Sequence, residues 1–298
     1  MMSSRLDHDR LFKELIETFF EEFIHLFFPN VYEHLDFQTL RFLSEELFTD
    51  VTEGEKFRLD LVVETKVKDE PGLVIVHVEP QSYKQDNFNE RMFIYFSRLY
   101  QKYRRKIVPI AIFSYNNPRN EPDSFQIDFP FLKPLDFQFL IIELKKQNWR
   151  EFIRYDNPIA AALLSKMGYT ISEKIEVKKE FFRMLLRLEL DTAREALIAG
   201  FFESYLKLSE QEEQLFLDEV KLMKPEEGEK IMEIMTSYER KGREIGREEG
   251  RQEGRQEGLQ EGRVQVARKM LDKKMSLEVI KDVTGLSIET LERLRDEL

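Results

Sequence analysis

Three polar residues lie on two short apolar runs and could together hold a divalent cation. Asp60 lies in the run from 57 to 64, and Glu79 and Gln81 close the run from 72 to 81. Both runs are short and rich in branched residues, and a turn-like Lys-Asp-Glu-Pro-Gly separates them, so we expect the two strands of a hairpin. Carboxylates inside strands are costly to desolvate unless they are paired or bind a cation. Two of them side by side suit Mg²⁺, which takes oxygen ligands and keeps positions for water and phosphate.

Side chains alternate along a strand, so Glu79 and His77 should share one face of the second strand. The hypothesis is a common pocket in which Asp60 and Glu79 bind Mg²⁺, with Mn²⁺ as its substitute and His77 close to the site. The metal would polarise a phosphoryl group and lower the pKa of a bound water. The alternative is that both acids are solvent-facing charges, with Asp60 paired to Arg58 or Lys66.

The elements around these runs follow the order helix, strand, strand, helix, strand. Apolar residues recur at three- and four-residue spacing over 9–28 and 88–106, which predicts two amphipathic helices. The run at 107–115, IVPIAIFSY, is typical of a buried strand, and 125–144 carries strand-like pieces broken by two prolines. We therefore predict an α/β fold.

The predicted helix over 88–106 carries basic residues that could contact a DNA backbone. Arg91, Tyr95 and Arg98 lie at i, i+4 and i+7 and should share one face. The end of the helix holds the densest basic patch, with tyrosines interleaved. The candidate contacts in this patch are Lys102, Arg104 and Arg105. The alternative for the patch is a solvated helix end that suits the helix dipole.

Composition limits the classes of function. The 298 residues include 46 Lys and Arg against 57 Asp and Glu, a net charge of −11, so any attraction to nucleic acid must be local. With 42% hydrophobic and 35% charged residues, and no apolar stretch near the roughly 18 residues of a membrane span, we expect a soluble globular protein with no membrane partner. The polar start predicts a cytoplasmic location. The absence of cysteine excludes disulfides, thiolate zinc sites and a cysteine nucleophile.

The C-terminal half is expected to be helical and contains the one sequence repeat. Helices are predicted over 159–167, 175–199 and 210–223. Glycines recur every four residues, at positions 242, 246, 250, 254, 258 and 262. Arginine and glutamate share this period, and each glycine costs a helix about 1 kcal/mol. The segment is therefore either a flexible charged linker or a helix that pairs with a second copy as a coiled coil, with Arg stripe against Glu stripe.

Three short helices are predicted after the repeat, over 264–274, 276–283 and 287–298. The last two surround a Thr-Gly-Leu-Ser sequence and have the shape of a helix-turn-helix. The final helix holds four acidic residues against two arginines, which makes it a poor partner for phosphates. Oligomerisation or partner docking is therefore favoured there over DNA reading.

Four segments resemble a known family. They are DRLFKEL at 9–15, RLDLVVE at 58–64, HVEPQS at 77–82 and NERMFIYFSRLYQKYRRK at 89–106. Together they resemble the recombination-promoting nuclease and transposase family (Rpn, YhgA-like) of the PD-(D/E)XK nuclease superfamily. The glycine repeat and the Thr-Gly-Leu-Ser segment are similar to the C-terminus of that family.

The resemblance implies a Mg²⁺-dependent DNA endonuclease with roles in recombination and a core of helix, three-stranded sheet, helix and strand. Asp60 matches the metal-binding Asp of the superfamily and Glu79 its Asp/Glu position. Gln81 stands in place of the Lys and lacks its charge, so either the metal suffices or another cation moves in. Asp9 and Lys13 match the first helix motif, and Lys13 is either that cation or the partner of Asp9.

Four parts are expected along the chain. They are a nuclease-like domain at 1–150, a helical region at 151–236, the repeat at 237–263 and a small helical module at 264–298. Two other functions stay open. One is a nuclease fold that has lost catalysis and serves in DNA binding or assembly. The other is an RNase H-like transposase with a third carboxylate, for which Asp128 and Asp136 are available.

Overall fold

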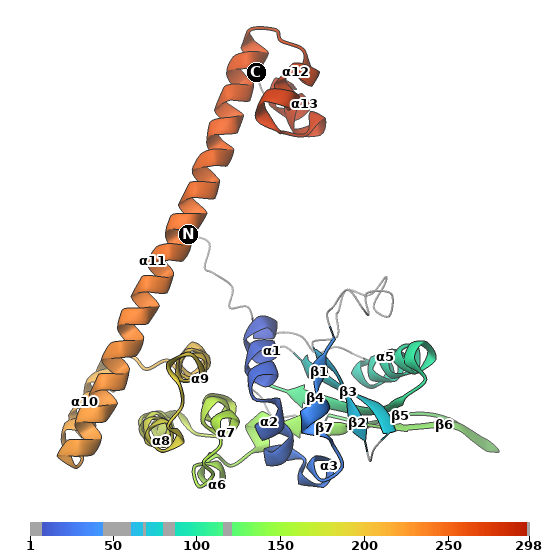
Figure 1. Ribbon diagram of the computed structural model, residues 1–298, viewed down its shortest axis with the longest axis vertical. Helices are drawn as coiled ribbons and strands as arrows, with labels where there is room; N and C mark the ends of the chain where they lie inside the picture. Colours follow the sequence, from blue (N-terminus) through green and yellow to red (C-terminus); the bar gives the residue numbers. More distant parts are fainter. Residues whose placement is uncertain (1–7, 44–60, 68–69, 80–86, 116–120, 297–298) are drawn as a thin grey trace. The chain divides into compact units, whose positions relative to one another are not determined.

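The computed structural model divides into two compact units, Met1–Met232 and Glu233–Leu298 (Figure 1). The structure describes residues 8–43, 61–67, 70–79, 87–115 and 121–296. The first unit combines sheet and helices, and the second is helical.

A five-stranded mixed sheet forms the centre of the first unit. Its order is β1 (Arg41–Phe42), β2 (Leu61–Val67), β3 (Glu70–Glu79), β4 (Lys106–Phe113) and β7 (Leu140–Glu143). The first three strands are antiparallel neighbours, whereas β4 runs parallel to β3 and β7 parallel to β4. The predicted hairpin is confirmed, since Val62 pairs with Ile75. The predicted strand 107–115 is confirmed as β4, and the expected order of elements is found.

Helix α5 (Phe88–Tyr103) covers one face of this sheet with its apolar stripe. Its buried Tyr95 and Leu99 pack against Val62 and Ile75, which the register places opposite each other on one face. The helix predicted over 88–106 is therefore confirmed, but it ends three residues earlier. Arg104 takes a positive φ of 52° and closes the helix.

The single helix predicted over 9–28 is wrong, because the structure has two. Phe19, with φ −127° and ψ 42°, separates α1 (His8–Thr18) from α2 (Phe20–Phe27). Both sides of the break are apolar and buried, so the periodicity continues across it. Pro29, directly after the predicted helix, begins the short α3 (Pro29–Tyr32), because proline suits the first turn.

A second, two-stranded sheet follows β4. It is the antiparallel hairpin of β5 (Ser124–Phe129) and β6 (Leu132–Gln138). Pro130 lies at the turn, as predicted. Pro134 does not break β6 but lies within it, next to a register shift, where a two-stranded sheet tolerates a missing N–H.

Helices dominate the rest of the first unit. They are α6 (Trp149–Phe152), α7 (Pro158–Leu163), α8 (Lys174–Leu188), α9 (Thr192–Tyr205) and α10 (Glu210–Lys221). Short 3₁₀ turns are η1 (Phe37–Thr39), η3 (Leu144–Lys146), η4 (Leu164–Lys166) and η5 (Ile171–Glu173). The continuous helix predicted over 175–199 is wrong. Glu189 has a φ of 45° and ends α8, and the Asp191 carboxylate then caps α9 by accepting from two backbone N–H groups.

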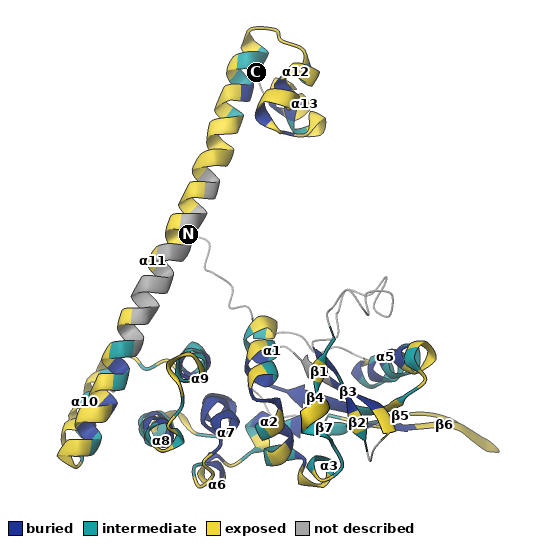
Figure 2. Cartoon of the chain, in the orientation of Figure 1, coloured by how far each residue is buried: buried dark blue, intermediate teal, exposed yellow. Residues whose placement is uncertain are grey.

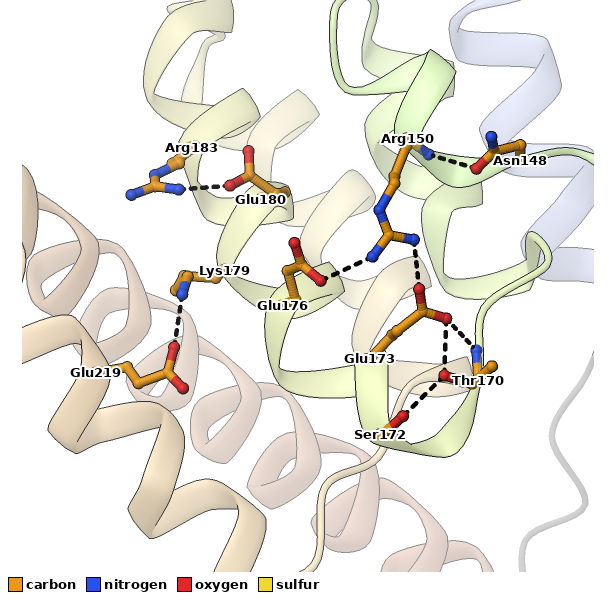
Figure 3. A network of polar contacts seen from close by, with 10 residues as sticks. All are labelled: Asn148, Arg150, Thr170, Ser172, Glu173, Glu176, Lys179, Glu180, Arg183 and Glu219. Atoms are coloured by element: carbon orange, nitrogen blue, oxygen red, sulfur yellow. Dashed lines mark hydrogen bonds and ion pairs between the residues drawn. The ribbon is translucent and has the colours of Figure 1, made fainter.

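A polar network ties α6 to the start of α8 (Figure 3). The Glu173 carboxylate accepts from the backbone N–H of Thr170 at 2.6 Å and from its hydroxyl at 2.8 Å. The Thr170 side chain in turn accepts from the backbone N–H of Glu173, which completes a capping box. Arg150 donates to Glu173 and, at 3.0 Å, to Glu176. The Thr170 hydrogen bond, with Arg150 second, lowers the pKa of Glu173 to about 2.

This pKa gives a prediction for stability. Because the folded-state pKa of Glu173 lies below its ordinary 4.5, its stabilisation is present above pH 4.5 and is lost as the pH falls through about 2. Glu173→Gln should therefore lower the melting temperature at pH 7, and the difference from wild type should shrink by pH 3. Circular dichroism melts at several pH values check this. A difference in melting temperature between wild type and Glu173→Gln that stays constant with pH would contradict this prediction.

Helix α11 (Pro225–Asp272) crosses from the first unit into the second and contains the repeat. The structure thus has a helix where the linker interpretation expected none. The helix predicted separately over 264–274 is the end of α11. A Cβ built on Gly250, Gly254, Gly258 or Gly262 meets nothing within 4 Å, so packing within the described chain does not require glycine there.

The second unit ends with α12 (Leu277–Thr284) and α13 (Ile288–Asp296), as predicted. Gly285, with φ 70°, closes α12, and the Ser287 hydroxyl accepts from Thr290 N–H at 3.2 Å. A buried cluster joins the two helices to α11. Its members are Ala267, Ile280, Leu286, Leu291 and Leu294.

Candidate functional site

The carboxyl ends of β3 and β4 meet at one edge of the five-stranded sheet. Glu79 is the last residue of β3, and the parallel register pairs it with Phe113, the last residue of β4. Pockets of α/β sheets form preferentially at the carboxyl ends of parallel strands. His77 also lies on β3, paired with Ala111. Asp60 and Gln81 lie outside the described residues.

A hydrogen-bonded chain reaches the same edge of the sheet from two helices. Ser114, fully buried, directly follows β4, and His8 at the start of α1 bonds to its Oγ through Nε2 at 2.8 Å. The Tyr205 hydroxyl at the end of α9 bonds to His8 Nδ1 at 2.6 Å. Both imidazole nitrogens are therefore used, which fixes the orientation of the ring. Sequence reasoning missed His8, although it immediately precedes the quoted helix motif.

Lys166 is buried next to Tyr205, the last residue of this hydrogen-bonded series. It is 1% exposed, its Nζ is 4.7 Å from the centroid of the Tyr205 ring, and no described residue accepts a hydrogen bond from it. Burial, followed by the nearby charge of Lys145, lowers the pKa of Lys166 to about 7. Burial likewise lowers the pKa of Lys145 and raises that of Tyr169 to about 12. The sequence signal was available, because Lys166 is a single charge within the apolar run at 159–167.

Two auxiliary candidates share α1 with His8. Asp9 is exposed and Lys13 is half-buried, one helical turn apart. The helix begins close to the end of β4, because His8 contacts Ser114. The first helix motif therefore begins near the sheet edge where β3 and β4 end.

The predicted DNA-facing side of α5 needs a correction. Arg91 and Arg98 are half-buried, but Tyr95 is 1% exposed and belongs to the core with Val62 and Ile75. Tyr95 points to the sheet because its spacing from Met92 and Leu99 places it on the apolar stripe. It is therefore withdrawn as a DNA contact.

The basic patch spans the end of α5 and the start of β4. Lys102 and Arg104 are exposed, and the Arg104 guanidinium lies 5.7 Å from the centroid of the Tyr100 ring. Arg105, by contrast, forms an ion pair with Glu64. Lys106 forms an ion pair with Glu70 at 2.6 Å. Part of the positive charge is thus neutralised within the protein.

The carboxylates available for a third acid do not lie on the five-stranded sheet. Asp128 is on β5 and Asp136 is on β6 of the separate hairpin. Asp136 pairs with Lys133 at 2.6 Å, and that hydrogen bond lowers its pKa. Asp60, the acid that they would have to join, lies outside the described residues, so the RNase H-like arrangement stays a hypothesis. Within the described residues, no group of three acidic or histidine side chains is placed to hold a metal ion.

Comparison with known proteins gives a family match for part of the second unit. Residues 260–296 match the family model for the C-terminal HTH domain of the Rpn/YhgA-like nuclease family. The match covers the end of α11 together with α12 and α13, so the predicted resemblance is confirmed for this segment. No curated protein and no solved structure matches the chain. No helix in the described part of the chain has the length and apolar character needed to cross a membrane.

Proposed function

We propose that this chain, whose C-terminal unit matches the helix-turn-helix domain of a nuclease family, is a Mg²⁺-dependent DNA endonuclease. The family match is the observation that carries the proposal. The position of Glu79 at the carboxyl end of β3, beside the parallel β4, supports it. Roles in recombination or transposition belong to the same proposal.

Asp60 and Glu79 would hold the metal, since their carboxylates are the hard oxygen ligands that Mg²⁺ prefers. When bound, Mg²⁺ supplies charge that polarises the scissile phosphoryl group and acidifies a water. Gln81 would orient the attacking water through its amide, and His77 would lie beside the site. Arg91 and Arg98 on α5, with Lys102 and Arg104 at its end, would contact the DNA backbone. Arg105 forms an ion pair with Glu64, so we expect it to contribute less to DNA binding than Lys102 and Arg104 do.

The test is nicking of supercoiled plasmid DNA by the purified full chain. Nicking should require Mg²⁺ or Mn²⁺, should stop when EDTA is added, and should be lost in Asp60→Ala. Calorimetry should show Mg²⁺ binding to wild type that is weakened in the variant. Identical plasmid bands for wild type and Asp60→Ala would refute the proposal.

A second candidate function is a catalytically inactive DNA-binding and assembly protein. Gln81, where the superfamily has Lys, favours it, as do the glycines of α11 at 250, 254, 258 and 262, where a Cβ would meet no described atom within 4 Å. In either case we propose self-association through the repeat, with the arginines of one copy against the glutamates of another. DNA binding and intact oligomers by light scattering, without Mg²⁺ binding or nicking, would establish this alternative.

A further inference from the structure

The tip of the β5–β6 hairpin exposes a group of large apolar side chains. Phe131 is 85% exposed, Leu132 57% and Phe129 50%. The Phe129 and Phe131 rings lie 5.8 Å apart at an angle of only 19°. Figure 2 shows the end of the hairpin in yellow, the colour of exposed residues. Large apolar side chains gathered in this way mark a binding surface.

The other half of the same hairpin packs on α5. The Phe125 ring lies 5.6 Å from Phe93, and the Phe137 ring lies 5.0 Å from Phe96. Asn89, one turn before Phe93, donates to the Ser124 carbonyl at 2.9 Å, so β5 and α5 run in the same direction. Figure 1 shows the hairpin running along α5 and projecting past it. The tip is therefore the part of an apolar ribbon that α5 does not cover.

The basic end of α5 lies toward the tip of the hairpin, because Asn89 near the start of α5 contacts Ser124 at the start of β5. Lys102 and Arg104 are exposed, and they lie at this end of α5, toward which the aromatic tip projects.

The hairpin carries acidic residues as well as the aromatic tip. Asp136 is neutralised by Lys133 at 2.6 Å and also accepts from Gln126 at 3.1 Å. Asp128 is exposed. Strand alternation places Asp128 and Asp136 on the opposite face from Ile127 and Leu135. The apolar face of the hairpin, with exposed cations at the end of α5 toward which the tip projects, is thus suited to an anionic ligand with flat apolar parts.

We propose that the hairpin tip is a stacking site for bases of single-stranded or locally opened DNA. Phe131 and Phe129 supply ring faces for the bases, while Lys102 and Arg104 bind the phosphates. Single strands are the fitting ligand because the faces of paired bases are already covered by their neighbours in a duplex. This inference rests on the proposal that DNA is the substrate, but it does not require cleavage.

The test measures binding of a labelled thymidine oligonucleotide to the full chain in EDTA. Phe131→Ala should weaken binding roughly tenfold and leave the salt dependence unchanged. Lys102→Ala should weaken binding and make it less sensitive to salt. Leu222→Ala is the matched control, because Leu222 is 86% exposed and lies outside the hairpin, and it should bind as wild type does. Equal affinity of Phe131→Ala and wild type would overturn the proposal.

A fluorescent variant separates DNA from other ligands of an apolar tip. Phe131→Trp adds an exposed reporter to a chain whose one tryptophan, Trp149, is 1% exposed. Its emission should be quenched by the oligonucleotide and not by vesicles of anionic lipid. Quenching by vesicles alone would overturn the proposal and assign the tip to a lipid surface. Both binding measurements are made in EDTA, which prevents cleavage. They therefore test the stacking site even if the protein does not nick plasmid DNA.

Discussion

Replacing Lys166 by methionine is expected to stabilise the first unit at pH 7. The amine is 1% exposed, has no hydrogen-bond acceptor among the described residues, and has a pKa lowered from 10.5 to about 7. Between these two pH values the unfolded chain binds a proton that the folded chain does not, so stability rises with pH across this window. The shift corresponds to on the order of 5 kcal/mol. Methionine fills a similar volume without this cost.

Urea denaturation at pH 7, 8.5 and 10 measures the effect. The gain in free energy of unfolding from Lys166→Met should be largest at pH 7 and should shrink toward pH 10. Lys178→Met is the matched control, because Lys178 is 4% exposed but pairs with Glu203 and Glu213, each at 3.1 Å. This control should not gain stability. If Lys166→Met leaves the free energy of unfolding unchanged at all three pH values, the amine has hydrogen-bond partners in the folded protein.

Glu79→Gln is expected to lower plasmid nicking by roughly a thousandfold or more. The substitution keeps the shape of the side chain but removes the negative charge proposed to hold Mg²⁺, which is worth several kcal/mol in the transition state. Initial rates at saturating and limiting Mg²⁺ measure the loss. The variant should also bind Mg²⁺ more weakly by calorimetry.

Glu70→Gln controls for charge on the same strand. Glu70 begins β3, at the end opposite Glu79, and pairs with Lys106 at 2.6 Å. We expect Glu70→Gln to retain wild-type nicking, with both variants showing wild-type circular dichroism. If Glu79→Gln nicks DNA as fast as Glu70→Gln does, Glu79 is not a metal ligand.

The periodic parts of the sequence predicted the elements that position the site. The short run of branched residues over 72–81 gave β3, in which Leu73, Val74 and Ile75 are all fully buried. The helical spacing over 88–106 gave α5, which has one buried stripe. The breaks at Phe19 and Glu189 were missed for a physical reason. Each break depends on the backbone angles of a single residue, and neither phenylalanine nor glutamate is a residue type that signals a break.

The polar chain around His8 shows the limit of local reasoning about the site. His8, Ser114 and Tyr205 are far apart in sequence and meet only because α1 and α9 pack together at the end of β4. Tyr95 shows the opposite error. Tyr95 was grouped with Arg91 and Arg98 because the three residues have helical spacing. An amphipathic helix buries one stripe of residues in the core, however, and Tyr95 lies on that stripe.

The buried Trp149 has a practical consequence for any unfolding study of this chain. It is the one tryptophan of the sequence and lies in the first unit, so the second unit contributes nothing to tryptophan emission. Far-ultraviolet ellipticity, in contrast, records the helices of both units. Two denaturation curves that separate with these optical signals would therefore reveal that the units unfold independently, and curves that superimpose would show that they unfold as one.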